Sequence, residues 1–281
     1  MTEAEWLASE DPAVMLRHLF DGPLSHPRLQ GRPIAVSDRK LRLFGCACMR
    51  LTRPFAADCE VSKWDLLAVE AAEKLADNPS WEASQEALEA GQLSGRQGVL
   101  WLTEDSGVFA ATQWANVWAA NTAAHAALLR EIVGNPWRPI RCSVSGHPLG
   151  SDTVAIQNGV HTGCDCRWIT PTVLSLAEAA YEERARVWKG REHDHDEGTG
   201  WQDAGHLDPN RLAVLADALE EAGCDNKRIL EHLRIGPTNR HSKGCGTRYR
   251  GCAPDCPKDQ WERNGPHVRG CHVIDAILGK E

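Results

Sequence analysis

Residues 208–223 read DPNRLAVLADALEEAG, and this stretch decides the fold class. Asp208 is a typical N-cap residue, Pro209 suits the first helical position, and Gly223 is a typical residue to follow a last turn. The stretch therefore predicts a helix with a marked start and a marked end. Strand-like alternation is nearly absent elsewhere, and TVAIQ at 153–157 is the one candidate strand.

Similar helix signals recur on both sides of this stretch. Thr2 with Glu5 forms a capping box, and Asp11 followed by Pro12 opens a helix that extends to about residue 20. Further helices are predicted over 37–51, 62–76, 80–91, 106–134, 170–188 and 225–234. The segments 21–36 and 189–206 are predicted loops. We expect an all-α protein built as a multi-helix array, with any short strands confined to a small zinc-ribbon-like loop.

The helical segments alternate with two Cys/His-rich loops, which suggests four parts. Residues 1–134 form an N-terminal helical part, and 170–235 form helical hairpins. Residues 135–169 are a first Cys/His insert, and 236–281 combine a second insert with a C-terminal apolar segment. Both inserts are rich in Gly and poor in apolar periodicity, so they need an external tie to become ordered.

Composition narrows the class of protein. The chain has 281 residues, of which 42% are hydrophobic and 25% charged, as in an ordinary globular protein. Its net charge of -8 argues against a chain that mainly coats nucleic acid or an anionic membrane. We see no secretory signal and no membrane-spanning run, so we expect a cytoplasmic protein. There, its 11 cysteines are expected to be thiols or metal ligands.

The first insert carries five Cys and His residues in the pattern C-x4-H-x13-H-x2-C-x-C. Cys142, His161, Cys164 and Cys166 are the simplest tetrahedral set, and His147 is a fifth candidate. Thiolate and imidazole are the ligand types that Zn²⁺ prefers. The sequence therefore predicts a structural zinc site here, and free thiols in a surface loop are the alternative.

The second insert reads H-x3-C-x6-C-x3-C. Its candidate zinc ligands are His241, Cys245, Cys252 and Cys256. A single site that pools ligands from both inserts is also consistent with the sequence. Any such zinc is expected to be structural, because the pattern implies no open ligand position.

The remaining cysteines are predicted to lie in the helical core, since free Cys is commonly buried. Cys48 falls on an apolar helix face, and His125 is expected to be a packed, hydrogen-bonded core histidine. His267 and Cys271 could share a ligand if their segment were helical. However, Gly270 and the preceding Gly-Pro favour a turn.

A basic loop within the second insert suggests an alternative function. Arg240, Lys243, Arg248, Tyr249 and Arg250 combine cations with an aromatic side chain, a pattern typical of nucleic-acid contacts. The acidic net charge argues against this reading.

Recognisable catalytic motifs are absent: there is no P-loop, GxGxxG after a strand, GxSxG or HExxH. We expect a non-enzymatic interaction scaffold with protein partners and structural zinc loops. The alternatives are a nucleic-acid-binding module that uses the loop 238–250 and an enzyme with an unrecognised Cys–His pair.

Several stretches resemble a bacterial, paralogue-rich family of uncharacterised helical proteins. They are MTEAEWLASEDPAVML, SDRKLRLFGCACMR, ALLREIVGNPWRPI, WITPTVLSLAEAAYEERA, GHLDPNRLAVLADALEEAGCDNKRILEHLR and GPHVRGCHVIDAILGK. RLAVLADALEEAG is also similar to segments of short repeat-companion domains. The resemblance implies a helical fold and no assigned activity. It also implies that both Cys/His loops are insertions, and that Met49 stands where the family usually has Cys.

Overall fold

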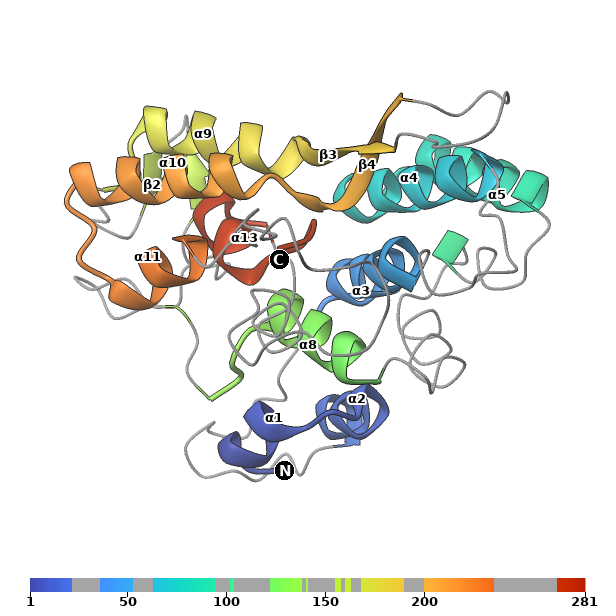
Figure 1. Ribbon diagram of the computed structural model, residues 1–281, viewed down its shortest axis with the longest axis horizontal. Helices are drawn as coiled ribbons and strands as arrows, with labels where there is room; N and C mark the ends of the chain where they lie inside the picture. Colours follow the sequence, from blue (N-terminus) through green and yellow to red (C-terminus); the bar gives the residue numbers. More distant parts are fainter. Residues whose placement is uncertain are drawn as a thin grey trace.

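Helices dominate the computed structural model, as the sequence predicts. The structure describes residues 1–21, 36–52, 63–94, 102–103, 122–137, 140, 155–157, 160–162, 168–189, 200–234 and 267–280. These residues form ten helices and two short antiparallel strand pairs (Figure 1). The all-α class is therefore confirmed. None of the described helices is both long and apolar enough to cross a membrane.

The first two helices begin at the caps that the sequence predicts. In α1 (Glu3–Ala8) the Thr2 hydroxyl accepts from the Glu5 backbone amide, and the Glu5 carboxylate accepts from the Thr2 amide. In α2 (Pro12–Asp21) the Asp11 carboxylate accepts from the amides of Ala13 and Val14. Each cap satisfies amides that the first helical turn leaves without partners.

The next helices pack in sequence order, α3 on α4 and α4 on α5. Helix α3 (Asp38–Thr52) is buried on nearly all sides, and it contacts α4 (Lys63–Asp77) and α8 (Thr122–Val133). Helix α5 (Trp81–Ser94) forms a hairpin with α4. The predicted end at Gly91 was wrong, because the helix continues to Ser94 and Gly91 is buried inside it.

Helix α8 (Thr122–Val133) is the described part of the helix predicted over 106–134, of which 106–121 lie outside the described residues. It ends as predicted at Gly134, whose φ of 77° lets its amide reach the Arg130 carbonyl at 2.8 Å. His125 on this helix is buried, as expected. Among the described residues neither ring nitrogen has a hydrogen-bond partner, so the hydrogen bonds predicted for it are not found there.

The helix predicted over 170–188 is shorter than expected. Helix α9 (Pro171–Glu182) starts at the Thr170 cap and stops at Glu183, whose backbone is extended. Residues Arg184–Lys189 form β3, which pairs with β4 (Gly200–Leu207). The predicted loop 189–206 is therefore corrected at both ends. Val and Trp in RARVWK favour a strand, and cross-strand pairing outweighs the helical reading.

The last helices follow β4 closely. Helix α10 (Pro209–Glu221) has the predicted Asp208 cap, and Gly223 follows with a φ of 93°. Helix α11 (Lys227–Arg234) is capped by Asn226 instead of the predicted Asp225, since the Asn226 side chain accepts from Arg228 N. The C-terminal apolar segment forms α13 (His272–Leu278).

A second strand pair lies within the first predicted insert. Strand β1 (Ala155–Gln157) pairs antiparallel with β2 (Val160–Thr162). The predicted strand TVAIQ is thus in part a strand. A zinc-ribbon-like arrangement is not shown, because the cysteines of this insert lie outside the described residues.

Two large hydrophobic clusters form the core. The N-terminal cluster joins side chains of α1, α2, α3, α4 and α8, and it includes Val268. The C-terminal cluster joins α9, α10, α11 and α13 with Leu207. Figure 1 places α13 centrally, between α9 and α10 on one side and α8 on the other. The C-terminal segment therefore lies where the two clusters meet.

Candidate metal centre

Four side chains converge at this junction: Glu131, His232, His267 and Cys271. One ligand-type atom from each lies within 4.8 Å of the corresponding atoms of the other three. His267 Nδ1 is 2.8 Å from Glu131 Oε1, and His232 Nε2 is 3.4 Å from Glu131 Oε2. His232 Nε2 is also 3.3 Å from Cys271 Sγ. This group could hold a metal ion.

Glu131 reaches the centre from the last turn of α8. Its side chain is 1% exposed, and its backbone carbonyl accepts a 2.7 Å hydrogen bond from His272 Nδ1. The Lys40 ammonium on α3 donates to the next carbonyl, that of Ile132, at 2.8 Å. These bonds satisfy carbonyls that a helix end leaves without partners, and they hold the carboxylate-bearing turn in place.

His232 comes from α11, whose apolar residues Ile229, Leu230 and Leu233 are buried in the C-terminal cluster. That burial directs the remaining face of α11 toward α8 and the C-terminal segment. The His232 ring packs edge-on against those of His267 and His272, each at a centroid distance of 4.7 Å. With its side chain 22% exposed, His232 is the most exposed residue of the four.

His267 and Cys271 are brought together by a turn. The Cys271 amide donates to the Val268 carbonyl at 3.0 Å, and Gly270 adopts a φ of 91°. The Leu207 amide of β4 donates to the His267 carbonyl at 2.8 Å, which fixes the start of the turn. The predicted turn is therefore confirmed. The expectation that His267 and Cys271 would come together only in a helix was wrong, because this turn places both side chains at one centre.

The electrostatics of the group depend on its burial. Burial by itself raises the pKa of the Glu131 carboxyl, but the charges and hydrogen bonds of His232 and His267 outweigh it and hold that pKa well below its ordinary value. Burial and the neighbouring Glu131 charge raise the pKa of the Cys271 thiol well above its ordinary value. Burial, with the charge of His232, lowers the pKa of His272 to about 3. The site thus concentrates negative charge on Glu131.

The geometry agrees with that of a four-coordinate ion. Bonds of ~2.0–2.3 Å at tetrahedral angles separate the ligand atoms by roughly 3.3–3.8 Å. The separations of His232 Nε2 from Cys271 Sγ (3.3 Å) and from Glu131 Oε2 (3.4 Å) fall in that range, whereas His267 Nδ1 lies closer, 2.8 Å from the other carboxylate oxygen. Small side-chain adjustments would complete the shell.

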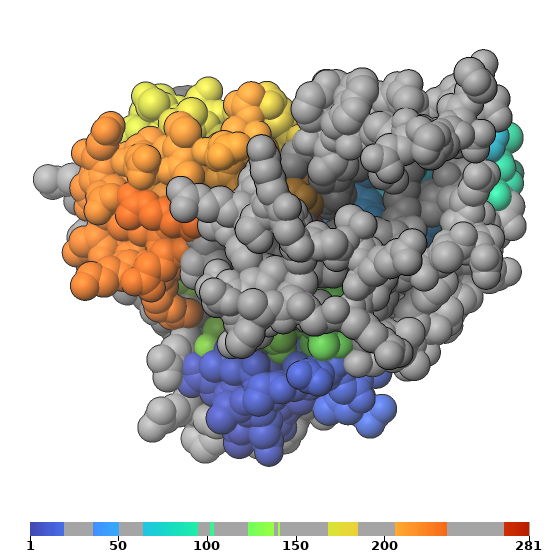
Figure 2. All heavy atoms as spheres, viewed as in Figure 1, coloured from blue at the N-terminus to red at the C-terminus, as the bar shows by residue number. Residues whose placement is uncertain are grey.

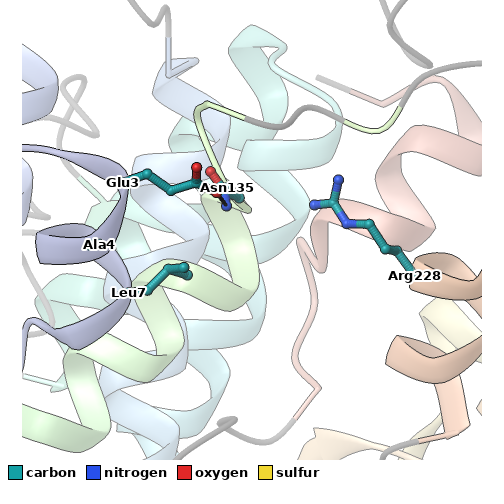
Figure 3. A pocket seen from close by; sticks show the side chains of 5 residues that line it. All are labelled: Glu3, Ala4, Leu7, Asn135 and Arg228. Carbon is teal, nitrogen blue, oxygen red and sulfur yellow. Dashed lines mark hydrogen bonds between the residues drawn. The ribbon is translucent and has the colours of Figure 1, made fainter.

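A shallow groove of about 310 Å³ lies near the centre and contains none of its four residues. It is lined by Glu3, Ala4 and Leu7 of α1, by Asn135, and by Arg228 of α11 (Figure 3). Asn135 Nδ2 donates to Glu3 Oε1 at 2.8 Å. The lining holds no thiol, imidazole or hydroxyl group, and its one carboxylate, that of Glu3, is bonded to Asn135.

The residues predicted as sites from the sequence lie almost entirely outside the described part of the chain. Of the candidate ligands in the first insert, only His161 is described, through its backbone in β2. The other metal candidates outside the described residues are Cys142, Cys164, Cys166, His241, Cys245, Cys252 and Cys256. So are the nucleic-acid candidates Arg240, Lys243, Arg248, Tyr249 and Arg250. Zinc binding and nucleic-acid binding by the two inserts therefore stay predictions.

Sequence reasoning missed Glu131 and His232 as site residues. Both sit in amphipathic helices and are separated by about a hundred residues, so no local spacing links them. By contrast, the assignment of other cysteines to the core is confirmed for Cys46, Cys48 and Cys224, which are buried.

No protein-family model, curated protein or solved structure matches this chain.

Proposed function

We propose that this chain is a non-enzymatic helical scaffold, held together by one structural Zn²⁺ bound by Glu131, His232, His267 and Cys271. The observation that carries the proposal is the convergence of four ligand atoms within 4.8 Å from three separate segments. Side chains of this kind rarely gather in a protein interior without compensation, because burying charged and polar groups is costly. His232 and His267 supply part of that compensation to Glu131, and a coordinated cation would supply it to all four groups.

Charge balance favours a divalent ion. With Cys271 as thiolate and Glu131 ionised, the ligands carry two negative charges, and two neutral imidazoles add none. A divalent cation therefore leaves the buried site neutral. Sulfur and nitrogen ligands disfavour Mg²⁺ and Ca²⁺, which bind oxygen atoms. Zn²⁺ suits a four-coordinate set of one thiolate, two imidazoles and one carboxylate.

A structural role fits better than a catalytic one. Catalytic zinc sites keep one position open for water or substrate, whereas structural sites are closed by four protein ligands. Glu131, His267 and Cys271 are each at most 4% exposed. The groove in Figure 3 does not include any of the four ligands. The ion would instead fasten α8, α11 and the C-terminal segment to one another.

The exposed apolar surface of the α4–α5 hairpin is the proposed contact site for a protein partner. Large apolar side chains are exposed there, led by Trp81 at 73% and Leu93 at 61%. Exposed apolar groups that lie together are typical of protein contact surfaces. The same hairpin also exposes Trp64, Leu67 and Leu88.

The four proposed ligands lie in stretches that resemble the helical family described above. Glu131, His232, His267 and Cys271 all fall in stretches that carry it, namely 127–140, 205–234 and 265–280. The cysteines of the two inserts do not. If the resemblance is a true relationship, the buried centre belongs to the shared helical core and the inserts are additions.

Cobalt substitution tests the centre directly. Co²⁺ in a tetrahedral site with a thiolate ligand gives intense visible bands and a sulfur-to-metal charge-transfer band. We expect Cys271→Ser to lose one equivalent of bound metal and the associated charge-transfer absorption. Cys224→Ser, which alters another buried thiol away from the centre, is the matched control and should keep both. Equal metal content in wild type and Cys271→Ser would refute the proposal.

A further inference from the structure

Residues 267–280, here called the C-terminal strap, contribute side chains to both hydrophobic clusters. Val268 packs in the N-terminal cluster, whereas Ile274 and Ile277 pack in the C-terminal cluster. A Cβ atom at Gly270 would lie 2.9 Å from Leu43 Cδ1, so the strap passes directly against α3. The two halves of the core therefore meet through this strap.

Ion pairs hold the strap independently of the metal ligands. The Arg39 guanidinium of α3 donates to both Asp275 oxygens, at 2.8 and 3.0 Å, and Asp275 is buried. The Arg269 guanidinium contacts Asp77 of α4 at 3.0 Å and Glu182 of α9 at 2.7 Å. Together with the apolar contacts, these pairs tie the strap to α3, α4 and α9.

Helix α11 is attached differently. It packs on α10 through Ile229, Leu230 and Leu233, and Arg234 pairs with Asp217 of the same hairpin at 2.8 Å. These contacts hold α11 mainly to α10, and a smaller contact joins it to α13 of the strap. Figure 2 shows the α10–α11 region at the surface of the molecule, beside the N-terminal helices. The centre lies where α11 meets α8, and His232 is its contribution from the α11 side.

We infer that α11 acts as a metal-dependent latch. When the ion is bound, it joins α11 to α8 and to the turn 267–271, and when the ion is removed, α11 is released from both. The inference rests on the proposed zinc centre. One ligand comes from α11, one from α8 and two from the turn, so a bound ion crosslinks three segments. When the ion leaves, α3, α4 and α9 keep the strap through Arg39 and Arg269, and α11 keeps only its other packing. Availability of Zn²⁺ then regulates whether the His232 side of α11 is joined to α8 and to the turn, while its apolar residues stay packed in the C-terminal cluster.

Hydrogen exchange on the full chain tests this latch. Backbone exchange is measured with Zn²⁺ added and after removal of the metal by a chelator. With free Zn²⁺ at ~100 times the dissociation constant, we expect exchange in α11 and residues 267–271 to slow by up to about 100-fold. Amides of α3 and α4 should change much less, because their packing does not depend on the ion.

Two variants on α11 sharpen the result. His232→Ala removes the latch ligand and should abolish the zinc-dependent protection of α11. Glu231→Ala alters the exposed neighbouring residue and should retain it. Because the wild-type comparison uses the unaltered chain, a poorly folded His232→Ala variant would not prevent the test.

The outcomes separate the latch from the centre itself. If one equivalent of Zn²⁺ binds through Cys271 but slows exchange uniformly over all helices, or not at all, the latch is refuted and the structural zinc centre stands. If no Zn²⁺ binds through Cys271, the proposed function fails and the latch fails with it.

Discussion

His125 should make the protein less stable in mild acid. It is 1% exposed, neither ring nitrogen has a hydrogen-bond partner in the described part of the chain, and burial lowers its pKa from 6.5 to about 4. Above pH 6.5 the imidazole is neutral in both the folded and the unfolded chain, so it adds no pH dependence. Between pH 6.5 and 4 the unfolded chain takes up a proton that the folded chain does not, and the free energy of unfolding falls.

The size of the effect follows from the two pKa values. A decrease from 6.5 to about 4 corresponds to about 3.4 kcal/mol when complete, and to about 2 kcal/mol at pH 5. Other groups also titrate in this range, so the measurement must isolate His125. Replacing it in the variant His125→Leu removes its contribution and leaves the others in place.

The assay is urea unfolding of wild type and His125→Leu at several pH values between 7.5 and ~4.5. We expect the variant to gain stability relative to wild type as the pH falls, by about 2 kcal/mol at pH 5. Leu129→Met, a buried substitution of similar volume that keeps His125, should show the wild-type pH dependence. A stability difference between His125→Leu and wild type that does not change with pH would refute the reasoning.

Three further predictions concern the backbone, the buried ion pair and the inserts. Gly270→Ala should cost about 1–2 kcal/mol more than Gly223→Ala in urea unfolding, because both glycines have a φ near 90° but only Gly270 has a side chain within 3 Å of the added Cβ. Asp275→Asn should cost about 3–5 kcal/mol by leaving Arg39 without its buried carboxylate, whereas Glu70→Gln, at an exposed site on α4, should change stability by less than about 0.5 kcal/mol. Equal costs within either pair would contradict these explanations. If the inserts bind zinc, serine at their cysteines should lower the total zinc content measured by mass spectrometry while the Co²⁺ spectrum of the buried centre persists. Those cysteines are Cys142, Cys164, Cys166, Cys245, Cys252 and Cys256.

The helices could be predicted because their signals are local. The Thr2 and Glu5 capping box, the Asp208 cap and Gly134 each act within one or two turns, and the structure confirms all three. The secondary-structure predictions failed where pairing with a distant segment decided between helix and strand. Residues 184–189 continue a helical pattern in sequence, but pairing with 200–207 makes them a strand. Such pairing cannot be inferred from a single segment.

The cysteine pattern led the sequence interpretation toward the inserts, where thiols are close together along the chain. In the described part of the molecule, the converging group contains one thiol, two imidazoles and one carboxylate drawn from three segments. A Glu on one amphipathic helix and a His on another look like ordinary surface or core residues when read alone. Only their arrangement identifies them as a site.

By itself, the sequence determined the helical class, most helix starts and the turn at 267–271, because caps, prolines and glycines act over a few residues. Tertiary structure alone decided that Glu131, His232, His267 and Cys271 lie together. Their meeting depends on two hydrophobic clusters closing around the C-terminal strap. The physical reason is range: capping bonds form between near neighbours, whereas a centre built from three segments exists only once the apolar packing of the whole chain has brought them into contact.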